Sequence, residues 1–492
     1  MPPQDRTLPT DAELDELHWI GDPHADNTVA AVLGEAPERT VAGDPRTTAR
    51  LHRVDDLNAV IRSWQNNAGV AGWRADPQQM AQGIGEPVQQ YVAAAQPLPP
   101  WADVERVARA EKMFMDYGAL SVTILFCASL PECYVVPDLA AVLHATGQLE
   151  DRAEHRIRTT GAMIFPVMME GGLTRPDGSG IAQILKVRLI HATVRNLILR
   201  GAPEAVVGAR RGIGGVAGVG GQDTGTIPPL ASIQPGDSMA RALFNHGWDL
   251  DACGLPNNQE ELAYTLLTFS YVFLRGMRRL GIAFTPSQEE DYLHAWNVAG
   301  YFLGIRRELM VDTMEQAAEL FARMQKRGRA DQALQPHAVD PRPHLAAALM
   351  AAMETVFPAG PWKHFPTLLT RRLIEPQSAR DLGLDGRVSW ISKVLFSMLM
   401  GTALGIDAVV RIVFPSFSIS RLITRAIGYR LTCALLMSQT RDLSVPGRLR
   451  PGIRALIAGW GKDAQAPKWM NAVEDKLTTN GDWEAMHPPE AQ

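Results

Sequence analysis

The stretch QILKVRLIHATVR, residues 183–195, is the most informative part of the chain because it places one histidine inside a run of apolar residues. Apolar positions recur on both sides of His191 at spacings of three and four, at Ile184, Val187, Val194 and Ile198. This spacing predicts a helix over about residues 181–200. Because His191 shares the apolar face, we expect its ring to point into the protein rather than into water.

Two arginines flank this histidine on the same side of the expected helix. Arg188 lies three residues before His191, and Arg195 lies four residues after it. A single inward imidazole with cations beside it suits an apolar cofactor that takes one nitrogen ligand and carries carboxylates at one edge, and haem fits that description. The alternative is a buried histidine that hydrogen-bonds to a neighbour, and these residues alone leave both interpretations open.

The composition is that of an ordinary globular protein. The chain has 492 residues, of which 46% are hydrophobic and 21% are charged, and its net charge is −5. This length is enough for a large core and two or three structural units. The slight acidic excess argues against a nucleic-acid-binding protein, because such proteins usually carry a surplus of basic residues.

The cysteines and histidines exclude several metal sites. The 4 cysteines are scattered, without a C-x-x-C pair or a C-x-x-C-H motif, so a zinc site, an iron–sulfur cluster or a covalently attached haem is not expected. A di-iron bundle needs Glu-x-x-His on two helices. That pattern occurs only at Glu484 and His487, before two prolines and in a polar tail, where no bundle helix is expected. The P-loop, H-E-x-x-H and G-x-S-x-G motifs are also absent.

No segment predicts a membrane span or an export signal. Residues 1–16 are polar and acidic, so we expect a cytoplasmic protein, or a secreted one if a leader was removed from this sequence. The longest apolar run, residues 394–406, is shorter than the roughly 20 residues that a span needs. We expect a core helix there, with a shallow membrane contact as the alternative.

Helical periodicity without strand patterns or internal repeats predicts an all-α chain. Residues 119–130 are almost wholly apolar, which places them at the centre of the fold, and Pro131 is expected to end that helix. A helix over residues 151–169, kinked at Pro166, is the expected neighbour of the histidine helix. Capping pairs are expected to start two further helices, at Asn258 with Glu261 and at Ser287 with Glu290. In all, further helices are expected over residues 105–116, 258–280, 289–303, 312–326, 343–356 and 389–435.

A glycine-rich stretch, residues 208–225, contains GIGGVA at residues 212–217, which matches the G-x-G-x-x-A pattern of dinucleotide-binding proteins. No strand is expected before it and no βαβ pattern follows. We therefore interpret the stretch as a flexible loop, such as a lid over a site, and leave its role open.

The helix before the histidine helix carries a second pair of candidate residues. Arg156 and Thr160 are four residues apart and share a helical face. Bound dioxygen gains partial negative charge, which a guanidinium and a hydroxyl opposite the iron would stabilise. The alternative is a surface arginine and a threonine packed in the core.

Several sequence blocks together resemble the latex clearing protein (rubber oxygenase) and MpaB-type oxygenase family. The likeness covers roughly residues 105–305, with a looser likeness over residues 418–436. The blocks are FCASLPECY at 126–134, KVRLIHATVR at 186–195, NQEEL at 258–262 through FS at 269–270, and DYLHAW at 291–296 through LG at 303–304. Their order and variety make the likeness fairly specific.

This resemblance implies a globin-like helical core that holds a non-covalent haem b. His191 matches the family's proximal iron ligand, and Arg188 and Arg195 match the arginines that support the haem site or its propionates. Arg156 and Thr160 match the distal-helix arginine and threonine. We expect three parts, a partly helical N-terminal extension (1–100), the globin-like haem-binding core (101–305) and a C-terminal helical region packed on the core (306–492).

The chain departs from the family's pattern in two places. Some rubber-cleaving members carry a lysine next to the distal threonine that caps the resting iron, and here that position is Thr159. We therefore expect an open or water-bound distal site at rest. The family's catalytic base is a glutamate, for which Glu132 is the first candidate and Glu150 the second. The alternative for Glu132 is a surface residue at the end of a helix.

Known members of the family use haem iron and dioxygen to cleave a carbon–carbon double bond of an isoprenoid chain, leaving carbonyl ends. The resemblance thus implies a dioxygenase acting on polyisoprene or on a prenylated substrate. The missing export signal favours a smaller, diffusible prenyl or terpenoid substrate over bulk rubber. The alternatives are a non-enzymatic haem-binding or apolar-ligand-binding protein and a peroxidase-like haem enzyme. A peroxidase usually needs a distal histidine, and His155 lies on another part of the helix than Arg156 and Thr160.

Overall fold

The computed structural model describes residues 7–35, 45–76, 78, 81–95, 97–145, 153–200, 206–207, 243, 248–334, 340–355, 357, 359–386 and 388–410. Within these ranges the chain is helical apart from one short parallel pair, β1 (Val206–Val207) with β2 (Trp248–Asp249). The all-α prediction is confirmed, with this two-residue pair as the exception. The glycine-rich stretch and Glu150 lie outside the described residues.

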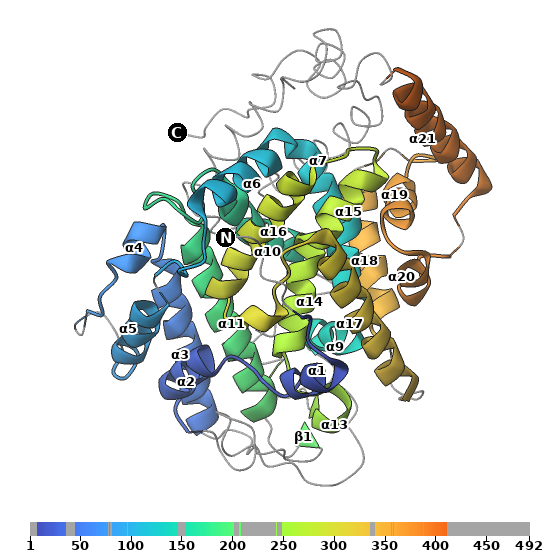
Figure 1. The fold of residues 1–492 in the computed structure, drawn as a ribbon. Helices are drawn as coiled ribbons and strands as arrows, with labels where there is room; N and C mark the ends of the chain where they lie inside the picture. Colours follow the sequence, from blue (N-terminus) through green and yellow to red (C-terminus); the bar gives the residue numbers. More distant parts are fainter. Residues whose placement is uncertain are drawn as a thin grey trace, which may run out of the picture.

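The helices follow one another in the order shown in Figure 1. They are α1 (Asp11–Leu17), α2 (Pro23–Leu33), α3 (Pro45–Arg62), α4 (Asn67–Ala71), α5 (Gly85–Ala94), α6 (Val104–Asp116), α7 (Gly118–Ile124), the π-helix η1 (Leu125–Ser129), α8 (Leu130–Cys133), α9 (Pro137–Ala145), α10 (Ala153–Met168), α11 (Gly180–Arg200), α13 (Leu250–Cys253), α14 (Gln259–Phe269), α15 (Tyr271–Arg279), α16 (Pro286–Phe302), the 3₁₀-helix η3 (Arg307–Leu309), α17 (Met314–Leu334), α18 (Arg342–Glu354), α19 (Phe365–Leu373), α20 (Pro376–Asp381) and α21 (Trp390–Val410).

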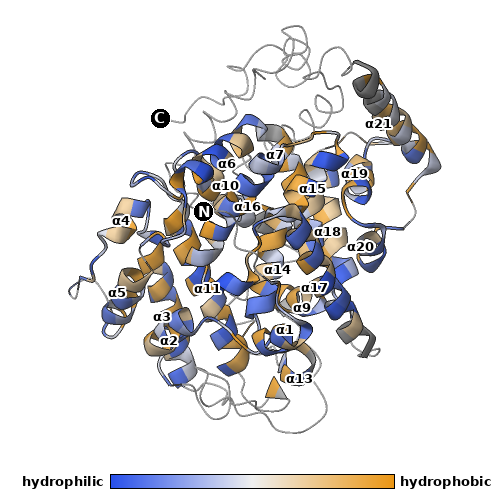
Figure 2. Ribbon diagram, viewed as in Figure 1, coloured by the Kyte–Doolittle hydropathy of each residue, from blue (hydrophilic) through white to orange (hydrophobic). Residues whose placement is uncertain are grey.

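The helices pack around two hydrophobic clusters. The larger cluster gathers residues of α6 to α10 and α14 to α19, and the smaller gathers residues of α2 to α5 with one flank of α11. Helix α11 belongs to both, because Ile184 lies in the larger cluster while Leu185 and Leu189 lie in the smaller. Figure 1 shows α2 and α3 beside α11, and Figure 2 shows the mixture of apolar and polar residues along these helices. The first hundred residues are thus built onto the histidine helix.

The apolar run over residues 119–130 is central, as predicted, but Pro131 does not end it. The chain passes from α7 into the π-helix η1, where the N–H of Leu130 donates to the carbonyl of Leu125. Helix α8 then begins at Leu130 and carries Pro131 in its first turn. Proline is tolerated there because the first N–H groups of a helix need no partner within it. The prediction was wrong because the π turn carries the helix past this proline.

Two expected helix boundaries also differ. The helix expected over residues 258–280 is broken at Ser270 into α14 and α15, although Asn258 caps its start as predicted by accepting from Glu261 N. Helix α16 begins at Pro286, one residue before the expected cap, and its capping box is made by Thr285 and Gln288. Pro286 explains the shift, because its fixed φ suits the first position of a helix.

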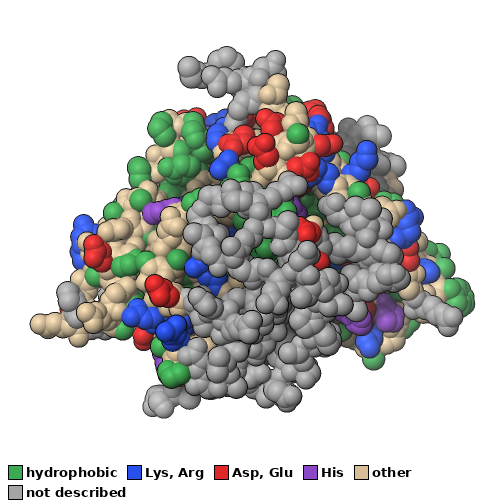
Figure 3. All heavy atoms as spheres, turned by 90° about the horizontal axis from the view of Figure 1, so that it is seen from below, with side chains coloured by type: hydrophobic (Ala, Val, Ile, Leu, Met, Phe, Trp, Pro, Cys, Tyr) green, Lys and Arg blue, Asp and Glu red, His purple; other side chains and the backbone are tan. Residues whose placement is uncertain are grey.

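A core helix was expected over residues 394–406, but only one side of α21 is buried. Phe396 and Met400 are buried against α19, whereas Trp390 is 72% exposed and Met398 is 64% exposed. Among the described helices none is alone both long and apolar enough to cross a membrane; α6 joined to residues 120–133 passes by length and composition, with an 89° bend. On the coloured part of the face in Figure 3, acidic and basic side chains are intermixed.

Candidate functional site

His191 lies on α11 and is half-buried. The ring atom Nδ1 is buried and has no hydrogen-bond partner within the part of the chain that the structure describes. Burial, helped by the positive charge of Arg195, lowers the pKa of His191 to about 4. The ring is therefore neutral near pH 7. Buried polar atoms in proteins are nearly always paired, so this nitrogen lacks a partner that the described residues could supply.

Arg188 is held by the N-terminal region rather than left free beside the histidine. Its Nε and Nη2 atoms donate to the two carboxylate oxygens of Asp22, at 2.5 and 2.8 Å. Asp22 is the N-cap residue of α2, and its side chain also accepts from Ala25 N. The guanidinium further donates to the Phe302 carbonyl at 3.3 Å and lies over the ring of Tyr91 on α5. Such a bidentate pair holds the guanidinium in one orientation and also balances its charge.

Arg195 is held in the same way one turn further along α2. Its Nη1 atom forms an ion pair with Asp26, and its side chain is only 1% exposed. The other two donors reach backbone carbonyls, with Nε at 2.8 Å from Pro256 O and Nη2 at 2.6 Å from Asn257 O. Every nitrogen of this guanidinium thus has an acceptor. Through these ion pairs both arginines join α11 to α2.

Asn257 connects Arg195 to the backbone of His191. It has a φ of 54°, and it is the one non-glycine residue with positive φ in the described chain. Its carbonyl accepts from Arg195, and its Nδ2 donates to the His191 carbonyl at 3.4 Å. Asparagine tolerates this left-handed conformation better than most residues. Strained backbone of this kind occurs often at functional sites.

Two glycines permit the close approach of these groups. A Cβ at Gly304, where φ is +85°, would lie 2.6 Å from Asp22 Oδ2 and 2.7 Å from Arg188 Nε. A Cβ at Gly21 would lie 2.7 Å from Asp26 Oδ2 and 2.9 Å from Arg195 Nε. Each ion pair therefore has a position beside it that admits no side chain.

The predicted distal residues lie on α10, which packs directly against α11. Thr160 is half-buried and Thr159 is exposed. Arg156 lies one turn before Thr160 on the same helix, with its side chain outside the described part. The helix pair that the sequence predicted is therefore present, with Pro166 inside α10.

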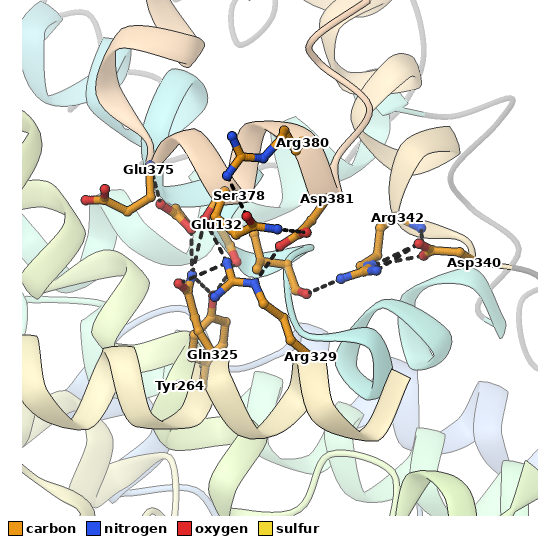
Figure 4. Close-up of polar contacts among 12 residues, drawn as sticks. Glu132, Tyr264, Gln325, Arg329, Asp340, Arg342, Glu375, Ser378, Arg380 and Asp381 are labelled. Carbon is orange, nitrogen blue, oxygen red and sulfur yellow. Dashed lines mark hydrogen bonds and ion pairs between the residues drawn. The ribbon is translucent and has the colours of Figure 1, made fainter. Parts of the chain in front are cut away.

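Glu132 is the centre of a separate polar network, which Figure 4 shows. Its carboxylate is 0% exposed, so the interpretation as a surface residue is wrong. Oε1 accepts from Arg275 Nη2 at 2.5 Å, and Oε2 accepts from Gln325 Nε2 at 2.8 Å and from Ser378 Oγ at 2.9 Å. These partners belong to α15, α17 and α20. None of them belongs to α10 or α11, so the hydrogen bonds do not join Glu132 to His191.

The structure contains a small cavity of about 20 Å³, whose lining includes His18, Asp138, Glu260 and Glu261. Sequence analysis did not identify it. Neither carboxylate oxygen of Glu261 has a hydrogen-bond partner among the described residues. Burial, with the nearby charge of Asp138, raises the pKa of Glu261 well above its usual value. The space is enough for one water molecule. Three separate segments supply these side chains, so no local motif marks the cavity.

The residues around His191 fit a haem held by one protein ligand. A neutral imidazole with an unpaired nitrogen is what a haem iron needs from a proximal histidine. Within the described chain no group of three or more His, Cys, Asp or Glu side chains is arranged to hold a bare metal ion. His191 would hold the iron, and the apolar residues on its helix face would contact the porphyrin.

Comparison with known proteins gives three likenesses. Residues 238–404 match a family model described as the catalytic domain of ER-bound oxygenase mpaB/B′ and rubber oxygenase. The rubber oxygenase of Streptomyces sp. (strain K30) is 21% identical over 306 residues, which are 61% of this chain and 61% of that protein. The match thus spans about three fifths of that relative's length. The solved structure of latex clearing protein in the closed state has a TM-score of 0.53 at 16% identity, covering 90% of this chain and 91% of that one.

The family-model match begins after α11, so it overlaps the predicted core of residues 101–305 only in its last part. The likeness of fold covers 90% of this chain. The catalytic-domain match, the rubber oxygenase relative and the shared fold agree with one another. Together they confirm the resemblance found in the sequence, so the chain is similar to the latex clearing protein and MpaB-type oxygenase family.

Proposed function

We propose that this protein is a haem b-dependent dioxygenase that cleaves carbon–carbon double bonds of a polyisoprenoid or prenylated substrate to carbonyl products. The observation that carries the proposal is the ring of His191, which is neutral near pH 7 and has a buried Nδ1 without a partner among the described residues. The family likeness supports the oxygenase chemistry, since the matched relatives are oxygenases by name.

The chain's own residues have distinct roles in this proposal. When bound, haem would supply the iron and dioxygen chemistry that the protein side chains lack. His191 holds the cofactor, and Arg188 and Arg195 keep its helix in place. The Thr160 hydroxyl and the Arg156 guanidinium would be the hydrogen-bond donors that α10 offers to an oxygen atom that gains negative charge. Thr159 stands where some relatives carry a lysine, so this chain would offer no lysine to cap the iron.

Glu132 is still the predicted base, but its hydrogen-bond donors restrict when the carboxylate can take a proton. Both carboxylate oxygens already accept hydrogen bonds, from Arg275 on one side and from Gln325 and Ser378 on the other. The backbone N–H of Glu375 also donates to Oε1, at 3.4 Å, so the carboxylate must release one of four donors to take a proton.

The substrate is expected to be recognised by shape and apolar area, because an isoprenoid chain has few polar groups to bind. Such a site must exclude water, and the apolar residues around α10 and α11 serve that purpose; Ile164 and Ile184 are both buried.

The substitution His191→Ala tests the cofactor assignment. With haem supplied during expression, the parent protein should purify with a Soret band and the variant with little or none. The exposed His52→Ala on α3 is the matched control and should keep the band. Full haem occupancy in His191→Ala would refute the assignment.

Oxygen uptake tests the reaction itself. The protein should consume dioxygen with squalene or polyisoprene and yield carbonyl products detectable by mass spectrometry. Haem binding without oxygen uptake on any polyprenyl substrate would instead indicate a binding protein. Peroxide-dependent dye oxidation in place of oxygen uptake would indicate a peroxidase-like enzyme.

A further inference from the structure

We propose that Asp22 and Asp26 are positioning residues for His191, acting from α2 through the two arginines that flank the histidine on α11. This inference rests on the proposed function, because it assigns the N-terminal helix a part in holding the cofactor ligand. It makes the first hundred residues part of the site rather than an appended extension.

Two aspartates at the start of α2 face two arginines on α11. Asp22 and Asp26 are four residues apart, so they lie one above the other at the start of α2. Arg188 and Arg195 lie on the two sides of His191 along α11. Asp22 pairs with Arg188 and Asp26 pairs with Arg195. Two fixed points on either side of the histidine prevent rotation of this part of α11 about its own axis.

The two carboxylates also belong to one hydrogen-bonded unit. Asp26 Oδ2 accepts from the backbone N–H of Asp22 at 3.0 Å, so the orientation of one carboxylate is coupled to the backbone of the other. Gly21 and Gly304 leave the room that both pairs need. Any displacement of α2 would therefore disturb both contacts together.

Because these ion pairs are buried, we infer that they mainly fix the orientation of the side chains and contribute less to the stability of the fold. Asp22 is buried and the Arg195 side chain is almost wholly inaccessible. A buried ion pair often stabilises a fold no better than apolar residues of similar size, because both charges lose their hydration. What such a pair does provide is a fixed direction, since each guanidinium nitrogen must face its acceptor.

The loop before α14 supplies further contacts to the histidine helix. Arg195 donates to the carbonyls of Pro256 and Asn257, and the side-chain amide of Asn257 donates to the His191 carbonyl. The loop before α14 is thus attached to Arg195 together with α2. Loss of the Asp26 charge is expected to loosen Arg195 and, through it, the backbone that carries the imidazole.

The variants Asp22→Asn, Asp26→Asn and the double variant test this role in the haem-loaded protein. Asparagine keeps the size and one acceptor oxygen but removes the charge. The control is Asp116→Asn, because Asp116 is exposed and pairs with the exposed Lys112 on the same helix. The readouts are the rate of haem loss to excess apomyoglobin and the iron–histidine stretching band of the ferrous protein.

We expect the double variant to lose haem at least tenfold faster than the parent and to show a shifted or broadened iron–histidine band, with smaller effects in each single variant. Asp116→Asn should match the parent in both. An unchanged loss rate and band in the double variant, with haem bound normally by the parent, would overturn the positioning role and leave the proposed function intact. A parent protein that takes up no haem would overturn both.

A second variant keeps the test decisive if the double variant does not fold. Asp22→Asn combined with Arg188→Gln removes both charges of one pair, so no uncompensated charge stays buried. The combined variant should fold and still release haem several-fold faster than the parent. A parent-like release rate would count against the inference.

Discussion

The carboxylate of Glu111 on α6 accepts a hydrogen bond from the backbone N–H of Gly171 at 2.8 Å, in the turn that joins α10 to α11. Its second oxygen accepts from Leu173 N at 3.2 Å. This turn connects the two helices that carry the candidate distal and proximal residues. One buried carboxylate on a third helix therefore sets how the two meet.

Glu111 should make stability fall as the pH rises toward neutrality. Burial raises its pKa to about 7, against a usual value near 4.5, so the folded protein keeps a proton that the unfolded chain has already lost. Between these values unfolding releases a proton, and stability decreases with pH by up to about 3 kcal/mol. Chemical denaturation at pH 4.5 and pH 7.5 should show this slope in the parent and a flatter one in Glu111→Gln. Parallel pH profiles would contradict the prediction.

His294 should have the opposite effect. Its Nε2 accepts from the backbone N–H of Asp103 at 2.9 Å, and burial lowers its pKa to about 4. The unfolded chain takes up a proton below pH 6.5 that the folded ring refuses, so stability is lost as the pH falls from 6.5 to 4. We expect His294→Gln to remove about 2 kcal/mol of this loss, less than the full shift implies because the ring is not wholly shielded. The exposed His344→Gln is the control and should leave the profile unchanged.

The variant Gly304→Ala should distinguish the steric cost of a Cβ beside the Asp22–Arg188 pair from the backbone cost of a positive φ. The new Cβ would overlap both charged groups, and φ is +85°. Gly360 has a similar φ of +95° but nothing within 4 Å, so Gly360→Ala measures the backbone cost alone, about 1–2 kcal/mol. Gly304→Ala should cost about 2 kcal/mol more, by urea denaturation. Equal costs at the two glycines would mean that the ion pair moves aside freely.

Glu132→Gln should be strongly destabilising, because it leaves Arg275 with a buried charge and a weakened partner. We expect a loss of about 3 kcal/mol, since the carboxylate of Glu375 lies 3.4 Å from Arg275 and offsets part of the cost. The double variant Glu132→Gln with Arg275→Met should recover much of that loss. A single variant as stable as the parent would argue that the network is looser than its geometry indicates.

The local features of this fold could be predicted from the sequence. The spacing around His191 predicted the limits of α11 to within a residue, and Asn258 marked the start of α14. Both depend on residues within a few turns of one another. The π turn before Pro131 and the break at Ser270 were missed, because packing of the surrounding helices overrides local helical preference there.

The partners of the site residues could not be predicted in the same way. Asp22 and Arg188 are 166 residues apart, and acidic residues are common along the chain, so nothing local indicates which of them meets Arg188. The same holds for Glu132, whose partners come from three distant helices. Sequence resemblance gave the identities of the arginines but not what they touch.

Because α11 forms a wall of both hydrophobic clusters, this protein cannot be shortened to a minimal catalytic fragment by trimming its amino end. Removal of residues 1–100 would expose one entire flank of α11 to water, including Leu185 and Leu189, and would strip Arg188 and Arg195 of their counter-ions.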